Sequence, residues 1–315
     1  MQFVSFRQKN NESYGILDGL QIYELKNQGS LPHSMLAFLE NSEVNLNEAT
    51  KLFTQNKTKL PNFKLEQVEL LAPVPKPPSM RDGYAFRQHV QTARRNRGLE
   101  MLPEFDLFPV FYFTNHQTVT GPGNVEVQKL HLDKLDFELE VAIVIGKKGK
   151  NISPAKADEY IFGYTIMNDW SARALQMEEM KLNLGPAKGK DFATSIGPTL
   201  ITRQSLKNSG SLRETANGEV LDASMKAFLN GKQYSEGNVN QMNWTFAQII
   251  SRASYGVTLY PGDVIGSGTV GTGCFLELNG SKITNNLWLK PDDEMVLEVE
   301  GLGRLENKIV LVGEQ

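Results

Sequence analysis

The clearest hydrophobic and polar alternation lies in the middle of the chain, where residues 136–145 read DFELEVAIVI before a glycine. Neighbouring side chains of a strand point to opposite faces, so Asp136, Glu138 and Glu140 are expected on one face, roughly 6.5–7 Å apart. The apolar side chains between and after them are expected on the other face, against a core. The pattern predicts one strand that carries three carboxylates in a row.

Similar patterns predict the remaining elements. Strands are expected near 108–113, 124–129, 262–266, 274–278, 293–300 and 307–312, and helices over 82–97, 169–182 and 238–252. Residues 1–70 contain short strand-like segments and one helical stretch near 34–41. Four prolines in 71–79 predict a linker between a small N-terminal β-containing domain (1–70) and a larger domain (80–315). Strands outnumber helices, which predicts a β-rich α+β fold.

Composition excludes several classes of protein. A chain of 315 residues with a formal net charge of -3 is not expected to bind nucleic acid or a membrane surface. The single cysteine, Cys274, excludes an internal disulfide and a cysteine-rich zinc site, which suits a reducing cytoplasm. The start lacks the apolar core of a signal peptide, and no apolar run approaches the ~20 residues of a membrane span. We therefore expect a cytoplasmic protein.

The acidic triplet allows two interpretations. Three like charges beside an apolar strand repel one another and resist desolvation, and a hard cation such as Mg²⁺ or Ca²⁺ relieves both effects. The alternative is an edge strand whose acidic face is solvated.

Two further segments carry candidate chemistry. Asn168 or Asp169 suits the N-cap of the helix expected there, and Asp169, Arg173 and Gln176 then share one helical face. A simple surface ion pair would explain Asp169 and Arg173, but not Gln176.

The second segment lies upstream, where Asp82 suits a helix cap. His89 is either an ordinary surface histidine or a base beside a carboxylate site.

Two glycine-rich loops resemble nucleotide-binding motifs in residue pattern but not in the expected structure around them. Residues 266–271 match a dinucleotide fingerprint, but the strand expected at 274–278 leaves no helix N-terminus for a pyrophosphate. In residues 185–191 the two glycines are one residue closer together than in a P-loop. Asp191 also stands where a P-loop has the Ser or Thr that holds Mg²⁺. No nucleotide cofactor is expected.

Five motifs in order, from about residue 71 to the C-terminus, resemble the fumarylacetoacetate hydrolase family. They are Asp82-x-Tyr84-x-x-Arg87-Gln88-His89, residues 136–140, residues 168–173, Leu184-Gly185-Pro186 with Gly189-Lys190, and Pro261-Gly262-Asp263 with residues 267–269 and 276–278. The resemblance implies a mixed β-sandwich roll, a homodimer, and one divalent cation, Mg²⁺ first and Ca²⁺ or Mn²⁺ as alternatives.

Site residues follow from the same resemblance. The implied metal ligands are Asp82, Glu138, Glu140 and Asp169, whereas Asp136 matches the motif without being a ligand. The implied catalytic residues are His89, Glu277, which orients it, and Lys190, and the implied substrate contacts are Tyr84, Tyr112, Arg173, Gln176 and Thr269. The chain departs from the family pattern at Met180, where a tyrosine is expected, and at Gly98, where an arginine is expected and Arg94, Arg95 or Arg97 stands nearby.

The implied activity is metal-dependent hydrolysis of the carbon–carbon bond of a 1,3-diketo acid, above all fumarylacetoacetate to fumarate and acetoacetate in aromatic amino-acid breakdown. His89 is expected to deprotonate water, with Lys190, Arg173 and Gln176 stabilising charge in the intermediate. The alternatives are an acylpyruvate or fumarylpyruvate hydrolase, a keto-acid decarboxylase or isomerase of the same fold, and a non-catalytic metal-stabilised binding protein. The His89 and Glu277 pair favours hydrolysis, because decarboxylation needs no general base.

Overall fold

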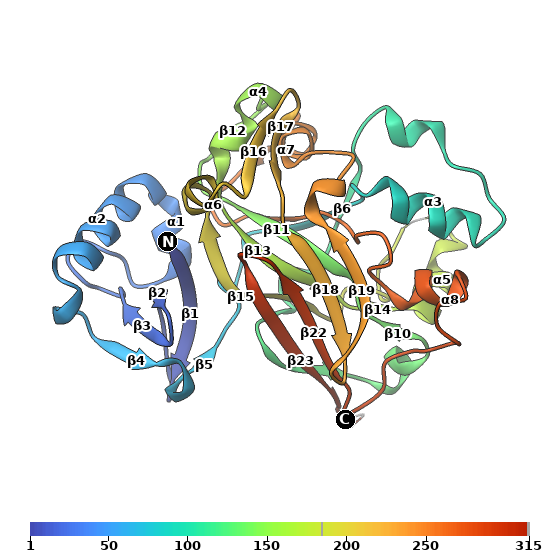
Figure 1. Ribbon diagram of the computed structural model, residues 1–315, viewed down its shortest axis with the longest axis horizontal. Coiled ribbons are helices and arrows are strands. Elements are labelled where there is room, and N and C mark those ends of the chain that lie inside the picture. Colours follow the sequence, from blue (N-terminus) through green and yellow to red (C-terminus); the bar gives the residue numbers. More distant parts are fainter. Residues whose placement is uncertain (184, 314–315) are drawn as a thin grey trace.

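The computed structural model describes residues 1–183 and 185–313, and two β-sheets dominate it (Figure 1). Across the larger sheet the strands are β4 (Asn62–Lys64), β3 (Gln21–Glu24), β2 (Asn11–Asp18), β1 (Gln2–Gln8), β15 (Thr194–Thr202), β13 (Ile161–Asp169), β11 (Leu139–Ile145), β21 (Val264–Gly266), β6 (Met80–Gly83) and β7 (Phe111–Phe113). β5 (Glu69–Leu70) adds to β1, and β8 (Val119–Thr120) adds to β15. Most neighbours are antiparallel, but β21 and β6 run parallel, so the sheet is mixed.

The second sheet packs on one face of the first. Its strands are β19 (Lys232–Asn238), β18 (Ser224–Leu229), β22 (Glu294–Val299), β23 (Gly303–Leu311) and β9 (Gly123–Val127). Val141 and Ile143 of β11 belong to the same buried apolar cluster as Met225 of β18 and Leu297 of β22. Burial of this apolar surface drives the stacking of the two sheets. The β-rich α+β sandwich predicted from the sequence and the family resemblance is confirmed.

The N-terminal residues both extend the larger sheet and cover its other face. The N-terminal strands extend the sheet, because β1 pairs with β15. Helices α1 (Met35–Glu40) and α2 (Ser42–Gln55) lie beside it, and Phe38 of α1 packs against Phe3 with 5.2 Å between ring centroids. The same cluster includes Ala142 and Val144 of β11. β11 is therefore a central strand buried on both faces, and the alternative of an edge strand with a solvated acidic face is wrong.

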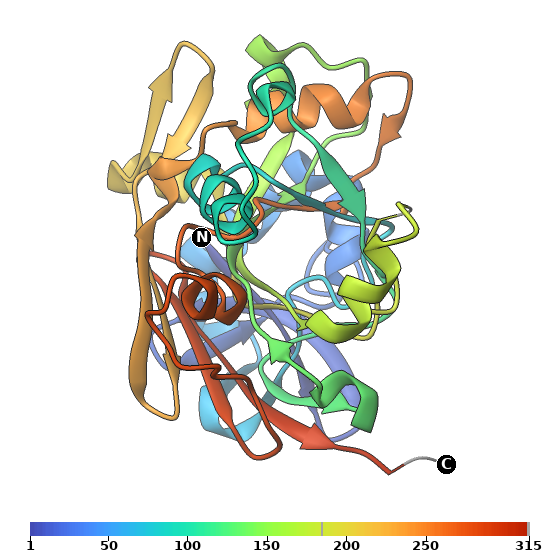
Figure 2. The same cartoon turned by 90° about the vertical axis from the view of Figure 1, so that its right-hand side faces the viewer.

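Three helices gather on one side of the molecule, facing the viewer in Figure 2. They are α3 (Arg87–Arg95), α5 (Arg173–Met180) and α8 (Phe275–Gly280).

The remaining elements lie outside the two main sheets. The helices are α4 (Pro154–Ala157), α6 (Arg203–Ser209) and α7 (Phe246–Ser254), and the 3₁₀ turns are η1 (Lys57–Lys59), η2 (Leu65–Gln67), η3 (Pro103–Asp106), η4 (Lys129–Leu132), η5 (Asp158–Tyr160) and η6 (Val239–Gln241). The strand pairs are β10 (Leu135–Asp136) with β14 (Ser171–Ala172), β12 (Gly149–Lys150) with β20 (Thr258–Leu259), and β16 (Leu212–Thr215) with β17 (Gly218–Leu221). Among the described residues, none of the helices has the length and apolar character needed to cross a membrane.

Several predicted elements are wrong at their starts. The helix expected from residue 82 begins at Arg87, because residues 80–83 form β6 and pair with β21. The helix expected from Asp169 begins at Arg173, because Asp169 ends β13. Long-range strand pairing overrides the local helical pattern in both places. The helix α2 was not predicted, and Leu184 of the fourth motif lies outside the described residues.

The strand expected at 274–278 is instead the helix α8. The backbone N–H groups of Phe275 and Leu276 donate to the Asp136 carboxylate at 2.7 and 2.9 Å, which satisfies the free end of the helix. A helix N-terminus thus does follow the glycine loop 266–271, contrary to the sequence prediction. Its first two amides are bound by Asp136.

Candidate active site

Three buried carboxylates form the centre of the site. Asp82 comes from β6, Glu140 from β11, and Glu138 from the residue just before β11; one oxygen of each lies within 4.8 Å of the others. Two glycines make room for them. A Cβ at Gly266 would lie 2.5 Å from Asp82 Oδ1, and the backbone N–H of Gly268 donates to Asp82 at 3.1 Å.

A fourth carboxylate joins the cluster through a shared lysine. Lys190 Nζ donates to Glu138 Oε2 at 2.6 Å and to Asp169 Oδ2 at 2.7 Å, and the Tyr112 hydroxyl also donates to Asp169. The other oxygen of Asp169 is buried and has no hydrogen-bond partner among the described residues. The structure therefore gathers Asp82, Glu138 and Glu140 and places Asp169 beside them, joined to Glu138 through Lys190.

The electrostatics of this cluster fit a cation. Burial, reinforced by the charge of Asp169, raises the pKa of Asp82 to about 8, and burial with Asp82 raises the pKa of Glu140 well above its usual value. Burial also opposes ionisation of Glu138, but Lys190 and Arg173 outweigh it and lower its pKa to about 2. Two acids thus lack the positive charge that would keep them ionised. Clustered carboxylate oxygens, one of them unpartnered, are the donors that a hard divalent cation prefers.

Asp136 has a different surrounding from the other two acids of its motif. The chain leaves β10 after Asp136 and enters β11 only at Leu139, so the expected single strand face with three acids is wrong. Arg173 Nε donates to Asp136 Oδ2 at 2.8 Å, and Arg173 Nη2 donates to Glu138 Oε1 at 2.8 Å. Asp136 therefore accepts hydrogen bonds both from the N-terminus of α8 and from the Arg173 guanidinium.

Arg173 and Gln176 lie side by side on α5. Arg173 Nη1 donates to Gln176 Oε1 at 3.0 Å. Asp169 is not on this helix, and its cationic partner is Lys190, so the predicted helical face of Asp169, Arg173 and Gln176 is wrong. The alternative of a surface ion pair is also wrong, because the Arg173 residue is only 2% exposed.

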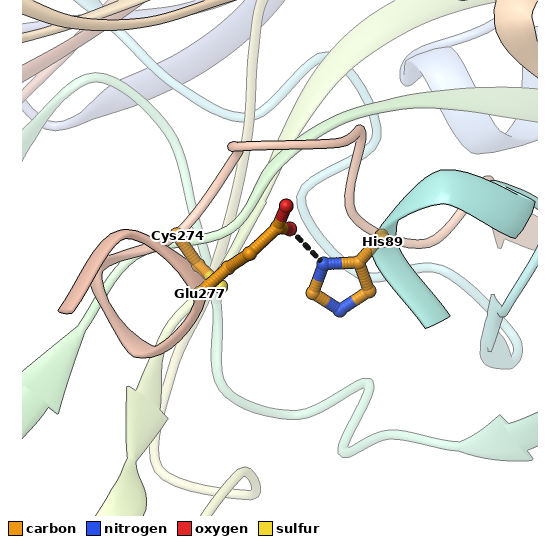
Figure 3. Close-up of side chains that lie close together, drawn as sticks. All are labelled: His89, Cys274 and Glu277. Atoms are coloured by element: carbon orange, nitrogen blue, oxygen red, sulfur yellow. Dashed lines mark hydrogen bonds and ion pairs between the residues drawn. The ribbon is translucent and has the colours of Figure 1, made fainter. Parts of the chain in front are cut away.

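A histidine and a glutamate from two helices form a buried pair (Figure 3). His89 of α3 lies with Nδ1 2.7 Å from Glu277 Oε2 of α8. The carboxylate only accepts hydrogen bonds, so in the neutral ring Nδ1 carries the proton and Nε2 has the free lone pair. Nε2 points away from Glu277 in Figure 3. The Tyr84 ring packs edge-on against the imidazole, with 5.9 Å between centroids.

A cavity of about 630 Å³ adjoins most of these groups. The predicted site residues that line it are Asp82, Tyr84, His89, Tyr112, Glu138, Arg173, Gln176, Lys190 and Thr269. Glu140, Asp169 and Glu277 lie one layer behind, where they contact Thr269, Lys190 and His89 respectively.

Other lining residues were not found by sequence reasoning. Phe111, Met177 and Trp288 supply an apolar wall, and single apolar residues carry no sequence signal that separates a cavity wall from a core. Met180 also lines the cavity, at the position where the family pattern has a tyrosine. Of the three arginines near Gly98, it is Arg97 that reaches the cavity wall.

Comparisons with known proteins identify the family. The family described as "Fumarylacetoacetate (FAA) hydrolase C-terminal" matches residues 79–310. The chain is 31% identical over 287 residues to "Oxaloacetate tautomerase Fahd2a, mitochondrial" of Rattus norvegicus, which covers 89% of this chain and 81% of that protein.

Two solved structures share the fold. A fumarylacetoacetate hydrolase of Exiguobacterium antarcticum has a TM-score of 0.74 at 24% identity, covering 99% of this chain and 100% of that one. Maleylpyruvate hydrolase from Sphingobium sp. SYK-6, solved in complex with manganese(II) and pyruvate, has a TM-score of 0.73 at 18% identity with the same coverage. With a family match over most of its length, the chain belongs to the fumarylacetoacetate hydrolase family.

Proposed function

We propose that this member of the family is a tautomerase of small 2-oxo acids, which interconverts the keto and enol forms of a dicarboxylate such as oxaloacetate. The observation that carries the proposal is the His89–Glu277 pair, which places a proton carrier on the same cavity as the oxygen-rich cluster. The activity named for the rat relative supports this choice of reaction over hydrolysis.

Asp82, Glu138, Glu140 and Asp169 would hold one divalent cation. The fit rests on the burial of all four acids, the raised pKa values of Asp82, Glu140 and Asp169, and the unpartnered oxygen of Asp169. When bound, such a cation supplies Lewis-acid stabilisation of the enolate charge. The manganese(II) bound to the Sphingobium relative supports a divalent ion, and Mg²⁺ is our first choice because all four donors are carboxylates.

The chain's own residues move the proton. Glu277 fixes the tautomer of His89, so that Nε2 takes a proton from the carbon beside the carbonyl of the keto form. The electron pair of the broken C–H bond passes into the enolate, and Nε2 then gives the proton to the enolate oxygen. Lys190 and Arg173 are bound to carboxylates, so their role is to hold Glu138 ionised and correctly placed. The apolar wall of Phe111, Met177 and Trp288 limits water near the base, which favours return of the proton over hydrolysis.

Hydrolysis of a 1,3-diketo acid, with fumarylacetoacetate or an acylpyruvate as substrate, is the second candidate. The same His89–Glu277 pair supports it, because a histidine that accepts a proton from carbon can also accept one from water.

One experiment separates the two candidates. Purified protein with Mg²⁺ is incubated with enol-oxaloacetate, fumarylacetoacetate and an acylpyruvate, and each reaction is followed by ultraviolet absorbance and by NMR of the products. A tautomerase accelerates the decay of the enol absorbance and leaves the carbon skeleton intact. Release of two acids from a diketo acid, without acceleration of oxaloacetate equilibration, would establish the hydrolase instead.

Replacement of the base tests the assigned chemistry in either case. His89→Ala should lower kcat by roughly 10²–10⁴, the usual contribution of a positioned base. Mg²⁺ affinity, measured by calorimetry, should stay unchanged, because His89 is not among the four clustered acids. His116→Ala is the matched control, since His116 is exposed and outside the cavity lining. A His89→Ala rate within threefold of wild type rejects the assignment.

A further inference from the structure

A second group of potential metal ligands lies next to the four-acid cluster. One ligand atom each of His89, Cys274 and Glu277 lies within 4.8 Å of the other two (Figure 3). All three residues are buried, with exposures of 6%, 0% and 2%. His89 comes from α3, whereas Cys274 and Glu277 belong to the start of α8. None of the three is a member of the four-acid cluster.

The donor chemistry of this triad differs from that of the acids. Imidazole nitrogen, thiolate sulfur and one carboxylate oxygen suit Zn²⁺ and similar ions, whereas Mg²⁺ and Ca²⁺ select oxygen. Two ligands of one tetrahedral zinc ion lie roughly 3.3–3.8 Å apart, as bond lengths of about 2.0–2.3 Å require. One ligand atom of each residue lies within 4.8 Å of the other two, so side-chain adjustment without a change of fold reaches this spacing.

We propose that His89, Cys274 and Glu277 form a binding site for thiophilic divalent cations of the Zn²⁺ type, and that an ion bound there inhibits the enzyme. Binding forms bonds from the cation to nitrogen, sulfur and oxygen. The S–H bond of Cys274 breaks, and its proton leaves to solvent, so no atom is oxidised or reduced. The ion enters from the cavity, on whose wall His89 lies.

Inhibition is expected because an ion bound to one nitrogen of the His89 ring changes what the other nitrogen can do. Nδ1 donates its proton to Glu277 and leaves the lone pair of Nε2 free to act as a base. A cation on Nδ1 needs the lone pair of that nitrogen, so the proton of the neutral ring must move to Nε2. His89 can then donate a hydrogen bond into the cavity but cannot accept a proton. This part of the inference rests on the proposed function, whereas binding of the ion does not.

Cobalt tests binding without any activity assay. Cys274 is the only cysteine of the chain, so a thiolate-to-cobalt charge-transfer band can come only from this site. Co²⁺ is titrated into the protein in the presence of saturating Mg²⁺, which occupies oxygen-only sites. We expect a band that saturates at one equivalent in wild type and is absent in Cys274→Ala and Cys274→Ser. Absence of the band in wild type overturns the proposal, and this measurement requires no variant to fold.

Zinc inhibition tests the consequence. With Mg²⁺ saturating, Zn²⁺ should inhibit wild type at a concentration at least tenfold lower than it inhibits Cys274→Ala, whose rate without zinc should match that of wild type. Equal zinc sensitivity of the two proteins would place the inhibitory ion at the four acids and overturn the proposed inhibition. If neither protein turns over any 2-oxo or diketo acid, the proposed function fails, and the cobalt band still decides whether the site exists.

Discussion

Asp136→Asn exchanges one buried carboxylate oxygen for an amide NH₂ and should be the most informative single substitution for stability. The Asp136 carboxylate accepts four hydrogen bonds, from the backbone N–H groups of Phe137, Phe275 and Leu276 and from Arg173 Nε, at 2.7–3.0 Å. Two of the four donors bind Oδ2. In the variant, an NH₂ group at that place would face two donors, and Arg173 would keep only Glu138 of its two carboxylate partners.

The magnitude follows from these contacts. A hydrogen bond to a charged group contributes about 1.5–3 kcal/mol, and breaking a buried ion pair on one side costs about 3–5 kcal/mol. We therefore expect Asp136→Asn to lower the free energy of unfolding by about 3–5 kcal/mol, a large fraction of the roughly 5–15 kcal/mol that stabilises a folded protein. Since α8 also carries Glu277, kcat should fall.

Urea unfolding followed by circular dichroism measures this loss, and Asp222→Asn is the matched control. Asp222 also accepts from an arginine, Arg213 at 2.8 Å, and from two asparagines, but its side chain is 40% exposed. Water replaces such contacts, so the control should lose no more than about 1 kcal/mol. Equal losses in the two variants would refute the argument that burial makes Asp136 important.

Two further predictions concern charge in the metal-free protein. Because the pKa of Asp82 rises from 3.8 to about 8 on folding, its contribution to stability is complete below about pH 4 and is lost as pH rises toward 8, by up to about 1.4 kcal/mol per pH unit. Mg²⁺ should therefore raise the unfolding midpoint more at pH 8 than at pH 5, and equal effects would contradict this. Lys190→Met leaves Glu138 and Asp169 without their shared ammonium and should cost about 3–5 kcal/mol. Thermal unfolding should show that Mg²⁺ restores part of this loss, and a loss insensitive to Mg²⁺ would count against a cation beside these acids.

Local sequence was sufficient for the family and for strands such as β22 and β23, whereas the long central strands β13 and β15 were not predicted. The alternation of acidic and apolar residues in 136–140 and the apolar run that follows it predict a strand over 136–145, and β11 forms the second part of it, Leu139–Ile145. The ordered motifs identified the family, and Asp82, Glu138 and His89 of these motifs do line one cavity. Residue types carry this information directly, since carboxylates and imidazole have few other roles when they occur in such a set.

Contacts between distant parts of the chain decided the rest. Residues 275–280 form a helix because Asp136, 139 positions before Phe275, accepts hydrogen bonds from its first two backbone N–H groups, and no local pattern in the sequence indicates that partner. Asp82 and Asp169 lie on strands because β21 and β15 pair with those segments. Whether a carboxyl group of the site is ionised or protonated depends on its burial and on neighbours such as Lys190. Burial and these neighbours are both products of the tertiary structure.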